Sequence, residues 1–583
     1  MTQYFAPLDD LKFILDDVLK IQKLFSLSNF RHADLTLVHD ILISAARLAE
    51  EKISPINSIG DAEGAKLVDG GVYLPSEYSE IWKIICSGGW LGLDLPKENG
   101  GQALPRLLQA AFAEMTNGAC VSFCMLPLMS RAAARMLLEH GSPHLIEDFV
   151  DDLVSGEATA TICISEPGSG SDVGRIETRA MPMSDGTFQI SGSKTWISYG
   201  DHQLSSQIAH MVLARTPDGP PGTRGLSLFL VPKMTADTEC PRLNGVQVNS
   251  LESKMGLSAS PTCTLNFDQS KAWQIGSLGE GLTCIFTMVN TMRLEVAIQG
   301  VSIAGAATER AFRYAAERAQ GGPANHAPVK IISHPDVRRM LMIMRARTET
   351  LRALTLEAAH QFDVAEHGDS HDIRLDASLL VEWLLPICKA SATDAAVEVG
   401  NLCIQVHGGS GYVKDTGVEQ YMRDARVGSI YEGTNGIQAL DLVTRKLLKD
   451  NGIRYEIFVR RIQEDLERTK SDESISRVHS AVSHGLENLE KCAEVLRNQG
   501  RDEVDHLAAA TPFLRIASLV GCGWMCLRMA SVANTESVFD QRKRNTVEFF
   551  ITHLMTEIYW LADQVMSGAC ALYELEDEIF IGN

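Results

Sequence analysis

The chain has 583 residues, of which 45% are hydrophobic, and a formal net charge of -21 at pH 7. This length predicts several domains or one large multi-part unit with ample core. The acidic balance argues against nucleic acid as a partner and provides no basic face for an anionic membrane. Thirteen cysteines without a regular frame indicate reduced thiols in a cytoplasmic protein. The N-terminus is acidic where a signal peptide would be basic, which also favours the cytoplasm.

Residues 1–38 are expected to form an N-terminal helical extension. Its apolar residues follow helical spacing, and its acids should mark the polar side. The apolar set is Leu8, Leu11, Ile14, Leu15 and Leu19, and the acidic set is Asp9, Asp10, Asp16 and Asp17. Residues 39–157 hold further helical patterns, interrupted at 85–102 by a loop region rich in Gly and Pro.

The pattern becomes strand-like from residue 158. Runs such as ATATICIS (158–165), FQISGSKTWIS (188–198) and LSLFLVP (226–232) are separated by turn residues. We therefore predict a middle β domain over 158–280.

Helical patterns return over 281–450, where a C-terminal helical bundle is expected, and continue through an additional helical domain over 451–583. One long amphipathic run spans 289–319 and stops before Gly321-Gly322-Pro323. In the last part, Leu486, Leu489, Cys492, Val495 and Leu496 form one helical face. No apolar run is judged long enough to span a membrane; the most apolar, 516–529, is expected to be a buried helix in which Cys522 and Cys526 pack.

One short stretch, RDARVGSIYEGTNGIQ (423–438), places the single acid Glu432 before a tight turn of small residues. An acid at a helix N-terminus explains this pattern simply. A catalytic base is the alternative interpretation. A second Gly-rich turn, QVHGGSGY (405–412), lies nearby in sequence. Two such turns in a helical region cost conformational free energy unless a bound group occupies them.

Three other stretches carry candidate site residues. ISEPGSGSDVG (164–174) is an ordinary capped loop or a place where backbone approaches a ligand closely. Trp196 in the strand GSKTWIS packs in the core or against a flat ring. Arg318 in ERAQGG caps a helix or holds a phosphate. The familiar motifs for dinucleotides, P-loops, zinc proteases and esterases are absent, and the sixteen histidines show no spacing that predicts a metal site.

Together and in this order, these motifs resemble the acyl-CoA dehydrogenase family. The resemblance rests on GWLGLDLPKENGG, ISEPGSGSD, SGSKTWIS, KMGLSASPT, ERAQG, QVHGGSGY and RDARVGSIYEGTNGIQ, which run from about residue 85 to 445. It implies a mainly α fold with a β-barrel-like middle domain, in the order helical domain, β domain and four-helix bundle, followed by the extra C-terminal helices. The additions at both ends resemble a larger bacterial subgroup that includes 3-methylmercaptopropionyl-CoA dehydrogenases.

The resemblance implies FAD-dependent α,β-dehydrogenation of an acyl-CoA thioester to the trans-2-enoyl-CoA. Glu432 would remove the α-proton while the β-hydride passes to flavin N5. The best substrate is 3-(methylthio)propanoyl-CoA or another short or medium acyl-CoA, with medium or long straight chains as the alternative. Electron-transfer flavoprotein would accept the electrons, in a homodimer or higher homo-oligomer. An acyl-CoA oxidase and a non-enzymatic acyl-thioester or flavin binding protein are the competing hypotheses, although a binder would need no base.

The resemblance also implies site residues, position by position. The expected FAD contacts are Ile162, Ile164, Ser165, Trp196, Ser198, Arg318, Gln320, Gln405, Gly408, Gly409, Thr434 and Asn435. The expected substrate contacts are Ser171, Asn290, Arg293 and Gly433.

Two departures from the family pattern matter. Some members carry the base immediately before the arginine, where this chain has Met292, and Glu295 should lie on another helical face. The aromatic residue usual after the FAD arginine is missing from ERAQGG, which weakens the assignment of the adenine contacts.

Overall fold

The structure is a computed structural model of the chain, and it describes residues 4–235, 242–498, 502–534, 536–575 and 577–581. It contains two compact units. Unit 1 holds Ser44–Glu295, and unit 2 holds Phe5–Ile43 together with Val296–Asn583. The boundaries of the five segments proposed from the sequence stay a prediction.

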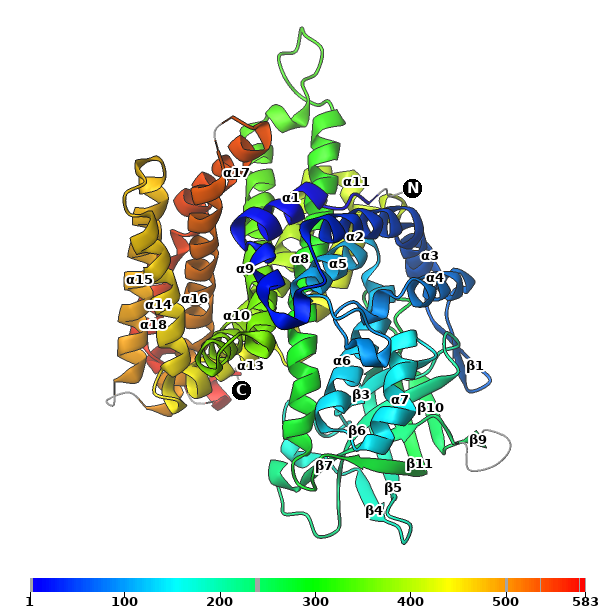
Figure 1. Cartoon of the computed structure of the whole chain (residues 1–583). Helices are drawn as coiled ribbons and strands as arrows, with labels where there is room; N and C mark the ends of the chain where they lie inside the picture. The colour runs from blue at the N-terminus through cyan, green and yellow to red at the C-terminus, as the bar shows by residue number, and fades with distance from the viewer. Residues whose placement is uncertain (1–3, 236–241, 499–501, 535, 576, 582–583) are drawn as a thin grey trace. The chain divides into compact units, whose positions relative to one another are not determined.

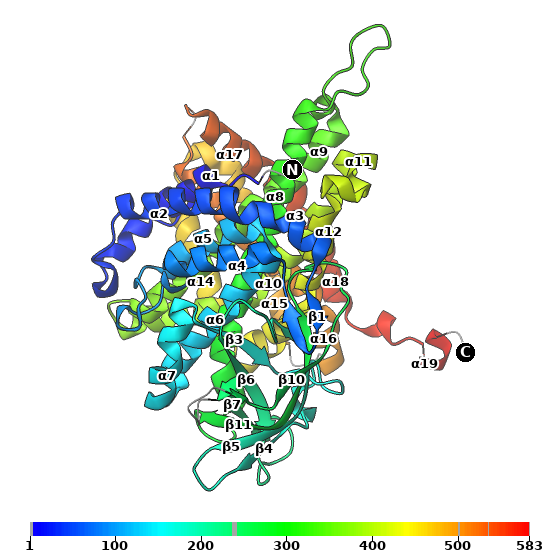
Figure 2. The same ribbon diagram turned by 90° about the vertical axis from the view of Figure 1, so that its right-hand side faces the viewer.

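Unit 1 begins with a group of helices (Figures 1 and 2). They are α3 (Ser54–Glu63), α4 (Ser76–Ser87), α5 (Arg106–Ala119), α6 (Val121–His140) and α7 (Pro143–Ser155). Nearly every residue of α5 is buried, and so are three quarters of those of α6. A two-stranded ribbon of β1 (Lys66–Val68) and β2 (Gly71–Tyr73) follows α3.

The rest of unit 1 is built on a seven-stranded sheet, as the strand-like runs predicted. Its strands are β3 (Ala158–Cys163), β4 (Arg179–Pro182), β5 (Phe188–Ser198), β6 (Gln207–Arg215), β7 (Leu226–Pro232), β10 (Val246–Leu251) and β11 (Thr262–Ile275). The order is β10-β11-β5-β4-β6-β3, and β7 pairs with both β11 and β6. The pairings β11–β5–β4–β6–β7–β11 therefore close on themselves around a core that contains Phe188, Phe229 and Phe267. A short ribbon of β8 (Met234–Thr235) and β9 (Arg242–Leu243) lies outside this sheet.

Unit 2 contains the long helices of the bundle. They are α8 (Gly281–Glu317), which begins in unit 1, α9 (Pro335–His367) and α10 (His371–His407), followed by the short α11 (Gly409–Tyr412), α12 (Glu419–Ala425) and α13 (Asn435–Leu440). Small residues of α8 pack against α9 and α10, including Ala304, Ala307 and Ala311. The loop between α8 and α9 projects beyond the helix ends in both views (Figures 1 and 2).

The additional C-terminal helices belong to the same unit. They are α14 (Ile453–Thr469), α15 (Ser476–Arg497), α16 (Glu503–Val532), α17 (Val538–Phe549), α18 (Glu557–Ser567) and α19 (Asp577–Phe580). Figure 1 shows α14, α15, α16 and α18 running side by side. Four members of the predicted face of α15 are buried and Val495 is partly buried, which confirms that face.

The N-terminal extension folds as α1 (Leu8–Lys12), a π-helical turn (Phe13–Val18), a 3-10 turn (Ile21–Ser26) and α2 (Leu35–Arg47). The expectation that Asp10 faces solvent is wrong. Asp10 is 6% exposed and pairs with Lys543 of α17 and Arg352 of α9. Lys543 also reaches Glu349 at 2.8 Å. A carboxylate can be buried here because two cations compensate its charge.

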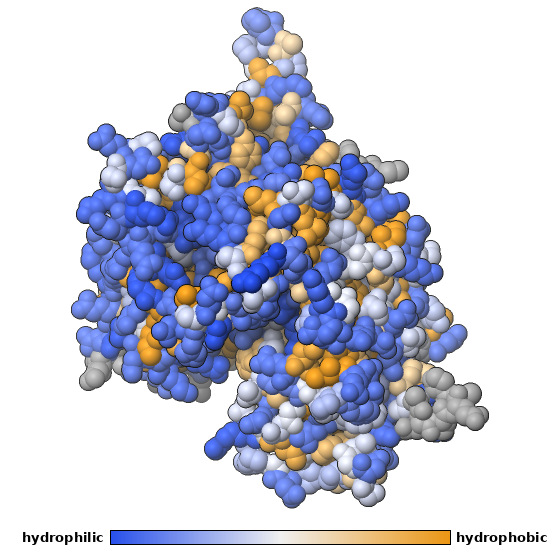
Figure 3. All heavy atoms as spheres, in the orientation of Figure 1, coloured by the Kyte–Doolittle hydropathy of each residue, from blue (hydrophilic) through white to orange (hydrophobic). Residues whose placement is uncertain are grey.

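The expectation that no helix is long and apolar enough to span a membrane is also wrong, when only length and composition are considered. Three helices, α6, α8 and α16, are long and apolar enough. The protein buries 83%, 67% and 83% of their most apolar windows, respectively, so core packing accounts for their composition. Cys522 and Cys526 pack inside α16. The face in Figure 3 is mainly hydrophilic, with hydrophobic residues in scattered groups.

Candidate active site

The turn that carries Glu432 lies in unit 2 between α12 and α13. Glu432 has a φ of +54° and Gly433 a φ of +83°, so the backbone turns through two consecutive left-handed residues. A glutamate rarely adopts this conformation, and such strain is characteristic of functional positions. The hydroxyl of Thr434 caps α13 by accepting from the Ile437 N–H at 3.2 Å. Glu432 is thus not the residue that caps this helix.

Two fully buried side chains hold the turn in place. The Lys389 ammonium donates to the Gly433 carbonyl at 2.7 Å and to Asn435 Oδ1 at 3.0 Å. The Gln438 amide donates to the carbonyls of Glu432 at 3.2 Å and Gly433 at 3.3 Å. Both side chains have 0% exposure. Hydrogen bonds from these two buried side chains therefore fix the backbone at Glu432 and Gly433.

The residue before Glu432 is anchored as well. The Tyr431 hydroxyl donates to Gln299 Oε1 of α8 at 2.5 Å. Burial and the neighbouring charge of Glu432 raise the pKa of Tyr431 above its usual range, so the tyrosine stays a neutral donor. Lys389, Gln438 and Gln299 were missed by the sequence reasoning. Lys389 did leave a signal, since it is a lone charge in the apolar run LLPICKASA.

The predicted phosphate contacts Thr434 and Asn435 have internal partners in this structure. The Asn435 amide nitrogen donates to the Ala390 carbonyl at 3.1 Å and to Asp394 Oδ1 at 2.7 Å. Its oxygen accepts from Lys389. Asn435 thereby ties the turn to α10, and its role toward FAD stays a prediction.

The other acid considered as a base, Glu295, lies in unit 1 in an ion-pair network. Arg131 bridges Glu295 and Asp94, each at 2.7 Å, and Arg135 also reaches Asp94 at 2.7 Å. Burial raises the pKa of Glu295 although Arg131 opposes this. Met292, at the alternative base position, is buried and has no group that takes a proton.

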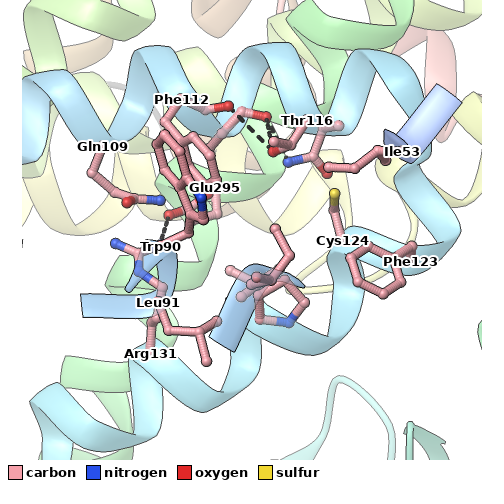
Figure 4. A pocket seen from close by; sticks show the side chains of 15 residues that line it. Ile53, Trp90, Leu91, Gln109, Phe112, Thr116, Phe123, Cys124, Arg131 and Glu295 are labelled. Carbon is pink, nitrogen blue, oxygen red and sulfur yellow. Dashed lines mark hydrogen bonds and ion pairs between the residues drawn. The ribbon is translucent and has the colours of Figure 1, made fainter. Parts of the chain in front are cut away.

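This network borders a small cavity between α5, α6 and the start of α8 (Figure 4). Figure 4 shows the Arg131–Glu295 pair beside the aromatic rings of Trp90 and Phe112, which stack at 4.8 Å between centroids. The cavity has about 30 Å³, which is room for a water molecule and not for an acyl chain.

The residues predicted to contact the flavin ring lie on β3 and β5 and in the segment after β3. Ile162 is partly exposed in a strand that is otherwise buried. Trp196 is 63% exposed and has a φ of +63°, where the β5–β11 register shifts. Such a mostly exposed aromatic side chain contributes little to the core of unit 1. Ile164, Ser165 and Ser198 are partly exposed as well.

A buried ion pair fixes the loop after β3. Lys194 donates to Glu166 at 2.8 Å and to the Ile164 carbonyl at 2.9 Å. Glu166 also accepts from the Thr178 hydroxyl at 2.6 Å. Burial alone would raise the pKa of Glu166, but Lys194 and the hydrogen bonds lower it below its usual range. The predicted substrate contact Ser171 lies beyond this anchor and is exposed.

The predicted phosphate and adenosine contacts of unit 2 come from two chain segments that lie together. Tyr314 near the end of α8 stacks on His407 at the end of α10, with ring centroids 4.2 Å apart. Arg318 and Gln320 follow the first helix, and all five predicted contacts here are exposed; the other three are Gln405, Gly408 and Gly409. A Cβ built on either glycine would meet no atom within 4 Å. The structure therefore presents a guanidinium and open backbone at one end of the bundle.

Asn290 and Arg293 lie on α8 within unit 1. Arg293 is 8% exposed, and its guanidinium lies 5.5 Å from the ring centroid of Phe286. Asn290 is partly exposed. Their predicted role toward the CoA moiety stays a prediction.

Comparison with known proteins decides the family. The N-terminal, middle and C-terminal domain models of acyl-CoA dehydrogenases match residues 39–157, 161–270 and 279–448. An acetyl-CoA dehydrogenase C-terminal-like model matches 458–576. The chain is 37% identical to the 3-methylmercaptopropionyl-CoA dehydrogenase of Ruegeria pomeroyi over 95% of its own length and 96% of that protein. The chain belongs to the acyl-CoA dehydrogenase family.

Other relatives agree with this assignment. This acyl-CoA dehydrogenase is 31% identical to a broad-specificity linear acyl-CoA dehydrogenase of Mycobacterium tuberculosis, over 91% of each chain. Its fold is similar to Caenorhabditis elegans ACDH-11 in complex with C11-CoA, with a TM-score of 0.80 and 22% identity over 99% and 97% of the two chains. It is also similar to a Bacillus anthracis acyl-CoA dehydrogenase complexed with FAD, with a TM-score of 0.76 and 20% identity over 99% and 94%.

FAD is the cofactor of this enzyme, and the side chains described above fit it. The exposed Trp196 offers a flat apolar face for a ring. The exposed Arg318 offers paired donors for a phosphate, and the open backbone at Gly408 and Gly409 permits close approach.

Proposed function

We propose that this acyl-CoA dehydrogenase uses Glu432 to remove the α-proton of the substrate, and that its preferred substrate is 3-(methylthio)propanoyl-CoA. The observation that carries the first part is the strained turn at Glu432, held by buried Lys389 and Gln438 while Thr434 caps the helix. A carboxylate needed only to complement a helix dipole would not require such support.

The mechanism follows from what each group can do. The Glu432 carboxylate accepts the α-proton, and its own backbone N–H stabilises the negative charge that develops on the thioester oxygen. Glu432 and Gly433 both have left-handed backbone conformations, and the small residues that follow leave room for a thioester. FAD, when bound, supplies the acceptor for the β-hydride.

The substrate proposal rests on the relative that is 37% identical along almost the whole chain and is named for 3-methylmercaptopropionyl-CoA. A straight-chain acyl-CoA is the second candidate, because another full-length relative is named for broad linear specificity. We further propose electron-transfer flavoprotein as the electron acceptor and a homodimer or higher homo-oligomer as the assembly. The exposed indole of Trp196 favours a partner that approaches the middle domain.

Anaerobic mixing of the FAD-loaded enzyme with acyl-CoAs from butanoyl to palmitoyl, and with 3-(methylthio)propanoyl-CoA, tests both parts. Loss of the oxidised flavin absorbance should be fastest with the thioether substrate. Glu432→Gln should retain FAD and bind acyl-CoA, but bleach slower by several orders of magnitude. Near-normal bleaching by this variant would exclude Glu432 as the base, and faster bleaching by long straight chains would reassign the substrate.

A further inference from the structure

A second and larger cavity lies in unit 2, away from the Glu432 turn in sequence. It has about 270 Å³ and is bordered by the N-terminal extension, α9, α14 and α16. None of its lining residues belongs to the Glu432 turn or to the predicted FAD and substrate contacts. The N-terminal extension also lies outside the segments that the family models match.

The lining of this cavity is positive although the whole chain carries a net charge of -21. Five of its residues are Lys or Arg and three are Asp or Glu. The acids already have partners, and that of Glu464 is Arg460 at 3.9 Å. Arg528 bridges Glu357 at 3.0 Å and Asp465 at 2.5 Å, and Arg468 reaches Asp465 at 2.7 Å. The positive excess is therefore left to other side chains.

Lys20 and Lys23 carry that excess. Neither forms an ion pair within 4 Å with any residue the structure describes, although Asp17 feels the charge of Lys20. Lys20 has a φ of +57°, a conformation uncommon for a residue with a side chain. Both lysines line the cavity, and both are exposed.

One buried acceptor on α9 also faces this cavity. Gln361 is 7% exposed, and its amide nitrogen donates to Glu357 at 2.9 Å. Its oxygen has no hydrogen-bond partner among the described residues. Buried amide oxygens are normally paired, so this oxygen is available to a donor inside the cavity.

We propose that this cavity binds a small organic anion that carries a carboxylate or phosphate group and a hydrogen-bond donor. Lys20 and Lys23 face the anionic group, and Gln361 accepts from the hydroxyl or amino group. The volume suits a metabolite smaller than drug-sized ligands. A bound anion would join the N-terminal extension to the helices that follow residue 450.

Calorimetric titration of the full-length, FAD-loaded enzyme tests this proposal at constant ionic strength. The probes are inorganic phosphate, citrate and adenosine monophosphate, with chloride as the reference anion. Saturable binding of at least one probe is expected, and which one binds separates a phosphate ligand from a carboxylate ligand. Saturation by none of the three would overturn the proposal.

Variants locate the site. The double variant Lys20→Met/Lys23→Met should bind the anion at least tenfold more weakly, and Gln361→Met should weaken the probes that carry a hydroxyl or amino donor. The matched control Lys449→Met/Lys491→Met removes two exposed lysines elsewhere in unit 2 and should bind normally. Unchanged affinity in both site variants would place the ligand elsewhere. Flavin bleaching by acyl-CoA should be the same in all of them, so the proposed base and substrate are tested separately.

Discussion

Replacing Lys389 by methionine would separate the placement of Glu432 from the stability of the fold. Methionine keeps most of the side-chain volume but removes the donors to the Gly433 carbonyl and Asn435 Oδ1. Hydrogen bonds from a charged donor contribute about 1.5–3 kcal/mol each. Removing a buried charge offsets part of that loss, so we expect unfolding to become easier by about 1–3 kcal/mol.

The effect on catalysis should be larger than the effect on stability. Of the two buried donors to the carbonyls of the turn, only Gln438 would remain, and a displacement of the base by about 1 Å costs roughly 100-fold in rate. We therefore expect kcat to fall about 100-fold while FAD content and KM change little. Stopped-flow flavin reduction well below the melting temperature measures kcat, and thermal unfolding measures stability.

Lys446→Met is the matched control. Lys446 is also a mostly buried ammonium of unit 2, and it contacts the Glu382 carbonyl and Asp441 at 3.3 Å, not the turn. It should lose stability but keep its kcat. If Lys389→Met melted earlier and still reduced the flavin within about threefold of the wild-type rate, Lys389 would be a structural residue only and the positioning argument would fail.

Three further predictions concern the other parts of the site. Arg318→Ala should retain FAD about tenfold less well after dialysis, while the control Arg339→Ala should retain FAD as the wild type does. Full retention of FAD by Arg318→Ala would show that Arg318 only caps the helix. Gly433→Ala should lower kcat at least tenfold with FAD retained, because φ is +83° and the new Cβ would lie 2.8 Å from Gln438 Nε2; normal turnover would show that the turn adapts. Burial lowers the pKa of His210 to about 3, so between pH 3 and 6.5 the unfolded state binds one more proton at this histidine than the folded state does. The free energy of unfolding therefore decreases by about 1.4 kcal/mol for each unit by which the pH falls within this window. Urea unfolding at pH 6 and pH 5 should show that His210→Gln loses less unfolding free energy between the two pH values than the wild type does. Equal losses in the two proteins would refute the role of His210.

Sequence patterns were sufficient for the strands and the long helices. Strand-like runs bounded by turn residues predicted β3, β5 and β7, and the Gly-Gly-Pro stop after residue 320 placed the end of α8 to within a few residues. The strands were predictable because short apolar runs lie between turn signals, and β7 is buried along its whole length. The closed path of strand pairings could not be predicted, because it depends on contacts between strands that are distant in sequence.

The candidate base could be found from sequence, but its support could not. Glu432 was noticed because a lone acid stood before small residues. Gln438 and Gln299 are ordinary polar residues in helical patterns, and only tertiary contacts show what they hold. Asp10 was misplaced for the same reason, since its partner Lys543 lies 533 positions away and helical spacing carries no information about such a distance.

The pairing of Asp10 with Lys543 also sets an order of events during synthesis. Asp10 leaves the ribosome 533 residues before its ammonium partner Lys543. Ser44–Glu295 is continuous in sequence and can fold in the meantime, because domains generally fold as units, N-terminal first. Asp10 must wait first for Arg352 and then for Lys543 before its carboxylate has both cations. A ribosome stalled between residues 352 and 543 should therefore hold a folded β domain and an Asp10 carboxylate that still lacks Lys543.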